Sequence, residues 1–178
     1  SSNSLARAMV KPMDSLSGPR RILEVGPGTG HMTREILRRM TEQDTFVICE
    51  INALFLARLR HDLQFNKYYQ RHRDRIRFYE GPVQGLKNSN IPGNYDLIVS
   101  SLPFLNFAGD EVDELFGLYS NLLSSRGILS TCEYIGIRKL SLIFSSMRNR
   151  ERMKEVDQVI RSWRRRAKSQ GALRSDVS

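Results

Sequence analysis

The sequence predicts an α/β fold with a doubly wound, mostly parallel sheet and helices on both faces. Two observations lead to this expectation. Short apolar runs of strand length alternate with longer stretches in which apolar residues have helical spacing. In addition, the run at residues 22–25 leads into a glycine-rich turn and then a helical pattern, as nucleotide-binding α/β units do. Sheets of this kind bind ligands beyond the carboxyl ends of their strands, so we expect the site there.

The expected elements follow one another in a regular order. Residues 1–14 contain a short amphipathic helix with Met9 and Met13 on its apolar face. Strands are expected at residues 22–25, 45–50, 76–79, 95–100 and 127–134. Helices are expected at residues 29–40, after Asn52 with Leu56, Leu59 and Leu63 on the apolar face, at 110–123 and across the basic segment 138–168. The 178 residues show no internal repeat and fit a single domain, residues 1–178.

Composition limits the class of protein. A hydrophobic content of 40% is typical of a soluble globular domain, and no apolar run approaches the roughly eighteen residues needed to span a bilayer. The start of the chain lacks the basic-then-apolar pattern of a signal peptide. Cys49 and Cys132 both lie in strand-like runs, which favours a reducing compartment over a disulfide. The scattered histidines give no metal-ligand spacing, so no metal is expected.

The net charge of +9 favours an anionic partner, either nucleic acid or an anionic membrane surface. Much of the excess lies in residues 138–168, where eleven Lys and Arg residues face three acidic ones. Within this segment Met153, Val156, Ile160 and Trp163 recur at helical spacing. An apolar stripe with a basic flank is typical of a helix at a membrane interface, although a helix that packs on the sheet needs the same stripe.

The glycine turn has the spacing G-x-G-x-G and follows an acidic residue. It differs from the dinucleotide fingerprint G-x-G-x-x-G, and no Gly-Lys-Ser/Thr follows as in a P-loop. The carboxylate of Glu24 would repel a pyrophosphate but suits a ligand with an ammonium group. The run Glu24-Val25-Gly26-Pro27-Gly28-Thr29-Gly30 resembles motif I of class I methyltransferases that use S-adenosylmethionine (SAM). This resemblance implies SAM as cofactor and S-adenosylhomocysteine as product.

Other strand ends supply the remaining cofactor contacts. Glu50 ends the second strand, about twenty residues after the glycine turn, where an acid can accept both ribose hydroxyls. Pro82 stands where SAM methyltransferases often carry an Asp beside the adenine, which leaves this role to Gln84 or to a backbone N–H near Val83. The residues expected to bind the cofactor are Glu24, Gly26, Pro27, Gly28, Thr29, Gly30, Glu50, Ile51, Gly81, Pro82, Val83, Gln84, Ser100, Ser101 and Leu102.

Two later runs make the resemblance more specific. They are Tyr-Asp-Leu-Ile-Val-Ser-Ser-Leu-Pro-Phe-Leu-Asn-Phe at 95–107 and Glu-Tyr-Ile-Gly-Ile-Arg-Lys-Leu at 133–140. Both resemble bacterial phospholipid N-methyltransferases, and the resemblance extends over about residues 5–168. It implies a Rossmann-like class I fold, methyl transfer to the amine of a phosphatidylethanolamine-type lipid, and a cytoplasmic monomer bound peripherally to the inner face of the membrane. Because that family continues past the late helix with further strands, we expect the last strands of the fold to be missing here.

The resemblance also implies acceptor-binding residues after the fourth and fifth strands. Pro103, Phe104 and Asn106 are expected to contact the acceptor. A lipid amine must lose a proton before it attacks the methyl group, and Tyr134 is the candidate to orient it or to accept that proton. Arg138 and Lys139 follow closely and are candidates to hold the lipid phosphate.

Two alternatives remain open at this point. RNA adenine N6-dimethylases carry Asn-Leu-Pro-Tyr/Phe after the fourth strand, where the Asn amide orients the target amine. The present chain has Ser101-Leu102-Pro103-Phe104 and lacks that amide, but its positive charge keeps RNA as a possible acceptor. The second alternative is a protein that binds SAM without catalysis.

Overall fold

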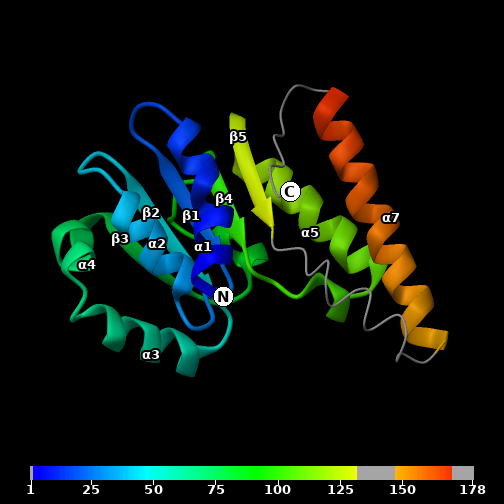
Figure 1. Ribbon diagram of the computed structural model, residues 1–178, viewed down its shortest axis with the longest axis horizontal. Helices are drawn as coiled ribbons and strands as arrows, with labels where there is room; N and C mark the ends of the chain where they lie inside the picture. Colours follow the sequence, from blue (N-terminus) through cyan, green and yellow to red (C-terminus); the bar gives the residue numbers. More distant parts are fainter. Residues whose placement is uncertain (1, 132–146, 170–178) are drawn as a thin grey trace.

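The computed structural model describes residues 2–131 and 147–169 as a parallel sheet between two layers of helices (Figure 1). The order of the strands is β3-β2-β1-β4-β5, and every neighbouring pair is parallel. This arrangement confirms the predicted doubly wound α/β fold. Tyr134, Arg138, Lys139 and Cys132 lie outside the described residues. The strands are β1 (Arg21–Val25), β2 (Thr45–Glu50), β3 (Ile76–Glu80), β4 (Tyr95–Ser100) and β5 (Leu123–Thr131).

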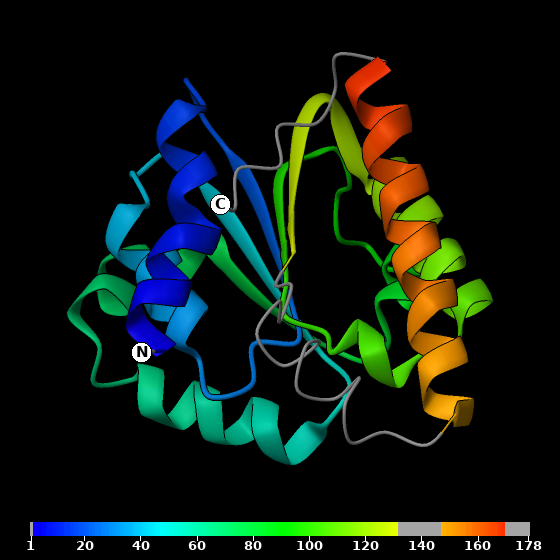
Figure 2. The same ribbon diagram turned by 45° about the vertical axis from the view of Figure 1, so that its right-hand side comes forward.

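The helices cover both faces of the sheet (Figure 2). One layer contains α1 (Ser2–Val10), α2 (His31–Arg39), α3 (Ala53–Leu63) and α4 (Lys67–His72), and the other contains α5 (Gly109–Leu122) and α7 (Met147–Ser169). Side chains alternate between the faces of a strand, so Ile22 packs with the first layer and Leu23 with the second. Short 3₁₀ turns complete the fold: η1 (Lys11–Ser15), η2 (Arg73–Arg75), η3 (Val83–Asn88) and η4 (Phe104–Asn106).

The main differences from the sequence prediction are two boundaries and one additional helix. The helix after the glycine turn begins at His31, because Gly30 adopts a left-handed conformation with φ of 75° and serves as the N-cap. β5 begins at Leu123 instead of residue 127, since Leu123 pairs with Tyr95 ahead of a register irregularity. Helix α4 was not anticipated; the Asn66 side chain caps it by accepting hydrogen bonds from two backbone N–H groups.

The apolar faces of α1 and α7 are buried inside the protein. Met9 on α1 is fully buried. On α7, no more than 9% of the surface of Met153, Val156 or Ile160 is exposed. Trp163 packs near Phe116 of α5, with ring centroids 6.3 Å apart. The expectation that these faces enter a membrane interface is therefore wrong for these side chains, because they cover the sheet and α5 instead. Among the described residues, no helix is both long enough and apolar enough to cross a bilayer.

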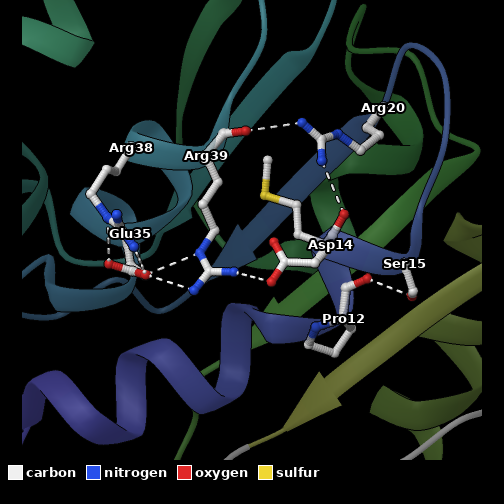
Figure 3. A network of polar contacts seen from close by, with 8 residues as sticks. Pro12, Asp14, Ser15, Arg20, Glu35, Arg38 and Arg39 are labelled. Atoms are coloured by element: carbon white, nitrogen blue, oxygen red, sulfur yellow. Dashed lines mark hydrogen bonds and ion pairs between the residues drawn. The ribbon is translucent and has the colours of Figure 1, made fainter.

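A polar network fastens η1 to α2 at the entry to β1 (Figure 3). The guanidinium of Arg20 donates to the Met13 and Arg39 carbonyl oxygens, at 3.0 Å each. Arg39 in turn pairs with Asp14 and with Glu35. These bonds anchor the amino end of β1 and leave its carboxyl end to form the site.

Candidate active site

A pocket of about 300 Å³ lies across the carboxyl ends of β1, β2 and β3. The loop after β4 and the first turns of α5 close its other side. This is the position where the strand order reverses between β1 and β4, which is where open α/β sheets bind their ligands. Backbone hydrogen bonds also join the residues that follow the strands to the neighbouring strand ends. The N–H groups of Gly26, Gly81 and Ser101 donate to the carbonyl oxygens of Cys49, Glu50 and Val25 respectively, at 2.9–3.0 Å.

The lining of the pocket includes a large part of the predicted cofactor site. Residues from four separate strand ends meet here because the strands are parallel and in register. The predicted residues in the lining are Gly26, Glu50, Ile51, Gly81, Pro82, Val83, Gln84 and Leu102. Residues that sequence reasoning did not select also line it, namely Val25, Cys49, Phe107, Glu111, Glu114 and Leu115.

The glycine turn needs its glycines for two different reasons. Gly26 has φ of 71°, and a Cβ there would lie 2.9 Å from the Leu102 side chain, so the turn must pass close to the β4 loop. Gly28 also has a positive φ, of 53°, but a Cβ there would meet nothing within 4 Å. The turn is therefore open on the side of Gly28, where a ligand can approach the backbone. The lining of the pocket includes Gly26 but not the rest of the turn, namely Pro27, Gly28, Thr29 and Gly30.

Glu24 lies underneath the turn and not in the pocket wall. Its side chain is completely buried, and its Oε2 accepts a 2.7 Å hydrogen bond from the Thr33 hydroxyl. Burial raises the pKa of this carboxyl to about 8, although the hydrogen bond from Thr33 acts in the opposite direction. Its Oε1 has no hydrogen-bond partner among the described residues. Glu24 thus ties α2 to β1 and keeps one buried oxygen available beneath the turn.

Glu50 is fixed in the pocket wall. Its Oε1 accepts a 2.9 Å hydrogen bond from the Asn52 N–H, while the Asn52 side chain caps α3. The neighbouring Cys49 also contributes to the wall, and burial raises the pKa of its thiol to about 12. The thiol therefore stays protonated at neutral pH, and Glu50 is the ionisable group that β2 presents to a ligand.

The loop after β4 is arranged differently from the sequence prediction. The Ser100 hydroxyl is buried against the Tyr119 hydroxyl at 2.9 Å, and the Ser101 hydroxyl donates to the Met32 sulfur at 2.8 Å. Phe104 is buried against Phe116 of α5, with centroids 5.3 Å apart. Pro103 and Asn106 are exposed outside the pocket lining. Phe107 is the aromatic residue of this loop that lines the pocket.

Carboxylates dominate the charge of the pocket. Glu50, Glu111 and Glu114 line it, and the described lining contains no Lys or Arg. Glu111 also caps α5, since its Oε2 accepts a 2.7 Å hydrogen bond from the Ala108 N–H. Glu111 and Glu114 lie three residues apart and therefore share a face of α5, a spacing that could have indicated them once the orientation of the helix was known. Such a pocket favours a cationic ligand.

The parallel sheet, the glycine turn and the pocket at the reversal of strand order define a nucleoside-binding α/β domain. The sequence matches the family described as "Methyltransferase domain" over residues 23–129, and the chain belongs to that family. None of the proteins with curated annotation matches the chain by sequence.

Solved structures with the same fold include several methyltransferases. An O-methyltransferase from Bacillus cereus in complex with S-adenosylhomocysteine (SAH) has a TM-score of 0.63 and 17% identity, over 90% of this chain and 66% of that one. The CurJ carbon methyltransferase has a TM-score of 0.58 and 21% identity, over 80% and 37%. Precorrin-6y C5,15-methyltransferase from Geobacter metallireducens has a TM-score of 0.54 and 15% identity, over 80% and 67%. The chain thus spans about two thirds or less of these proteins and shares their fold.

Proposed function

We propose that this chain binds SAM in the pocket at the carboxyl ends of β1–β3 and transfers its methyl group to the amine of a membrane phospholipid such as phosphatidylethanolamine. The observation that carries the proposal is the combination of an open glycine turn with a pocket whose charged residues are all carboxylates. The membership in the methyltransferase domain family supports the reaction class. The resemblance of residues 95–107 to phospholipid N-methyltransferases supports the class of acceptor.

The residues present fit SAM. The free edge of the turn at Gly28 leaves room for the methionine part. The buried carboxyl of Glu24 lies at the end of β1, and its Oε1 has no hydrogen-bond partner among the described residues. Glu50 would accept the ribose hydroxyls, and Ile51 and Val83 would provide apolar contacts for the base. When bound, SAM supplies a methyl group that is already activated by its sulfonium.

The protein's part in the reaction is to align and deprotonate the acceptor. Alignment of two reactants can supply several kcal/mol of the barrier reduction, and a pocket that excludes water supports it. Phe107 and Leu115 form an apolar wall next to Glu114. The Glu114 carboxylate is the described group best suited to attract an ammonium and to take up its proton. Tyr134, Arg138 and Lys139 keep their predicted roles at the acceptor as part of this proposal.

The same observations argue against RNA as the acceptor. A flipped adenine arrives on a phosphate backbone, and a pocket lined by Glu50, Glu111 and Glu114 repels this charge. In addition, the Ser101 hydroxyl, at the position of the Asn amide in adenine dimethylases, is engaged with the Met32 sulfur. An ammonium-bearing acceptor suits this environment better.

Label transfer tests the proposal. SAM with a labelled methyl group is incubated with the full chain and either phosphatidylethanolamine vesicles or total RNA. Label in the lipid extract and its absence from RNA are the expected results. Label in RNA alone would replace the lipid proposal with the adenine methylation alternative. SAM binding without label in either fraction would favour a non-catalytic SAM-binding protein.

A further inference from the structure

The exposed apolar side chains of this protein gather in one place. In the described residues, the large hydrophobic side chains that remain exposed are Ile51 at 71%, Leu54 at 80%, Phe55 at 55% and Phe65 at 82%. All four belong to α3 or its immediate flanks, and α3 lies along the lower edge of the molecule, far from α7 (Figure 1). A cluster of exposed apolar side chains on one element is typical of an interaction surface.

The exposure follows from the geometry of α3. Its inner face is formed by three buried leucines, Leu56, Leu59 and Leu63. Leu54, Arg58, His61 and Phe65 recur at intervals of four, three and four residues and therefore share the opposite, outward face. The rings of His61 and Phe65 contact each other edge to face, with centroids 5.8 Å apart. The outward face thus carries an apolar side chain at each end and basic groups between them.

The surroundings of this face are strongly basic. Residues 51–77 contain seven Lys and Arg residues and two acidic ones, Asp62 and Asp74, which gives a net charge of +5. All seven basic side chains are exposed: Arg58, Arg60, Lys67, Arg71, Arg73, Arg75 and Arg77. α7 is also basic, but its apolar side chains Met153, Val156 and Ile160 are buried, Val159 and Trp163 are partly buried against the core, and none of these five is among the exposed large hydrophobic side chains. Among the described helices, α3 combines exposed apolar and exposed basic groups.

We infer that the outward face of α3, together with the basic residues of α4 and η2, docks on an anionic membrane surface. Apolar side chains that enter the headgroup boundary, with basic residues around them, are the features of an interfacial helix. Ile51, which is exposed just before α3, also lines the pocket. Docking through α3 would therefore hold the mouth of the pocket against lipid headgroups. The inference deepens the proposed function, because it gives the enzyme's route to a lipid amine.

Vesicle sedimentation of the full chain tests the inference without any methyl transfer. The vesicles contain phosphatidylcholine with or without phosphatidylglycerol, neither of which offers a primary amine. The parent chain is expected to bind in proportion to the phosphatidylglycerol content. The variants Leu54→Ser/Phe65→Ser and Arg58→Glu/Arg75→Glu are each expected to bind at least about tenfold more weakly. Arg165→Glu/Lys168→Glu makes the same change of charge on α7 and is expected to bind nearly as well as the parent.

Several outcomes would overturn the inference. Vesicle binding that is equally weakened by the α7 variant would indicate non-specific attraction by net charge. If the parent chain does not bind anionic vesicles and forms a dimer that the Leu54→Ser/Phe65→Ser variant does not form, the face binds a second copy of the chain instead. Thermal unfolding midpoints equal to the parent's establish that each variant is folded. If the α3 variants lose vesicle binding but still methylate detergent-dispersed phosphatidylethanolamine normally, the result supports docking. If the parent chain binds vesicles but methylates no lipid, the proposed function is wrong and the docking inference stands.

Discussion

The Thr33 hydroxyl at the start of α2 donates a 2.7 Å hydrogen bond to the buried carboxyl of Glu24 in β1. This bond joins the strand before the glycine turn to the helix after it, so the turn is held from both sides. The other oxygen of Glu24 has no partner among the described residues, which leaves an ionisable group in an apolar environment directly beneath the proposed cofactor site.

Glu24 makes stability depend on pH. Burial raises its pKa to about 8 from 4.5, so the folded chain holds a proton that the unfolded chain releases. The contribution of Glu24 to the free energy of unfolding should therefore be largest below about pH 4.5 and fall by up to about 1.4 kcal/mol per pH unit between there and about pH 8. Denaturant unfolding at several pH values checks this. Glu24→Gln should remove this slope, while Glu151→Gln, on the exposed surface of α7, should keep it; identical profiles for both variants would contradict the account.

Asp44 makes an opposite contribution at the amino end of the sheet. Burial acts to raise the pKa of Asp44, but hydrogen bonds from Arg20 and the Thr41 N–H outweigh it and hold the pKa below its usual value. The resulting stability is present above about pH 4 and lost as the pH falls further. Asp44→Ala should lower the free energy of unfolding by about 3–5 kcal/mol, because it leaves the Arg20 guanidinium buried without its partner.

The matched double variant Arg20→Met/Asp44→Leu separates pairing from packing. It should recover much of the loss, because it removes both charges at once. Denaturant titration gives the free energies, and SAM affinity should stay at the parent's value in both variants. A double variant as unstable as Asp44→Ala would contradict this explanation.

Glu114 is expected to act on the acceptor. Replacement by Gln removes the carboxylate that attracts an ammonium, and kcat/KM for phosphatidylethanolamine should fall at least about tenfold. Initial rates at saturating SAM measure this. Asp110→Asn makes the same change on α5 outside the pocket lining, and equal kinetics for the two variants would remove Glu114 from the proposed mechanism.

The elements that could best be predicted from the sequence were those in which the spacing of apolar residues follows directly from their burial in the core. The β1 run and the Leu56, Leu59 and Leu63 face of α3 are buried as expected, because apolar periodicity and core contact have the same cause. The same pattern could not tell which surface an apolar stripe covers. For α7 the surface is α5 and the sheet, and for the outward side of α3 it is solvent.

The site was predictable where strand ends define it. Glu50 and Gly81 line the pocket because parallel strands bring their carboxyl ends to one edge. Glu114 and Phe107 could not be inferred in this way, because their directions depend on how α5 and its preceding loop pack. Phe104, which the sequence suggested as a contact for the acceptor, packs in the core against Phe116. Phe107 lines the pocket instead.

The central claim, that SAM binds at the glycine turn and Glu50, is tested most directly by isothermal titration calorimetry. The parent chain should bind SAM, Gly28→Arg should fill the open edge of the turn and abolish binding, and Glu50→Ala should weaken it at least about tenfold. Gly18 also has a positive φ, of 79°, with nothing within 4 Å of its Cβ position, and it lies before β1, outside the glycine turn. Gly18→Ala therefore reproduces the backbone strain alone and should bind SAM like the parent. Parent-like affinity in both Gly28→Arg and Glu50→Ala would contradict the claim.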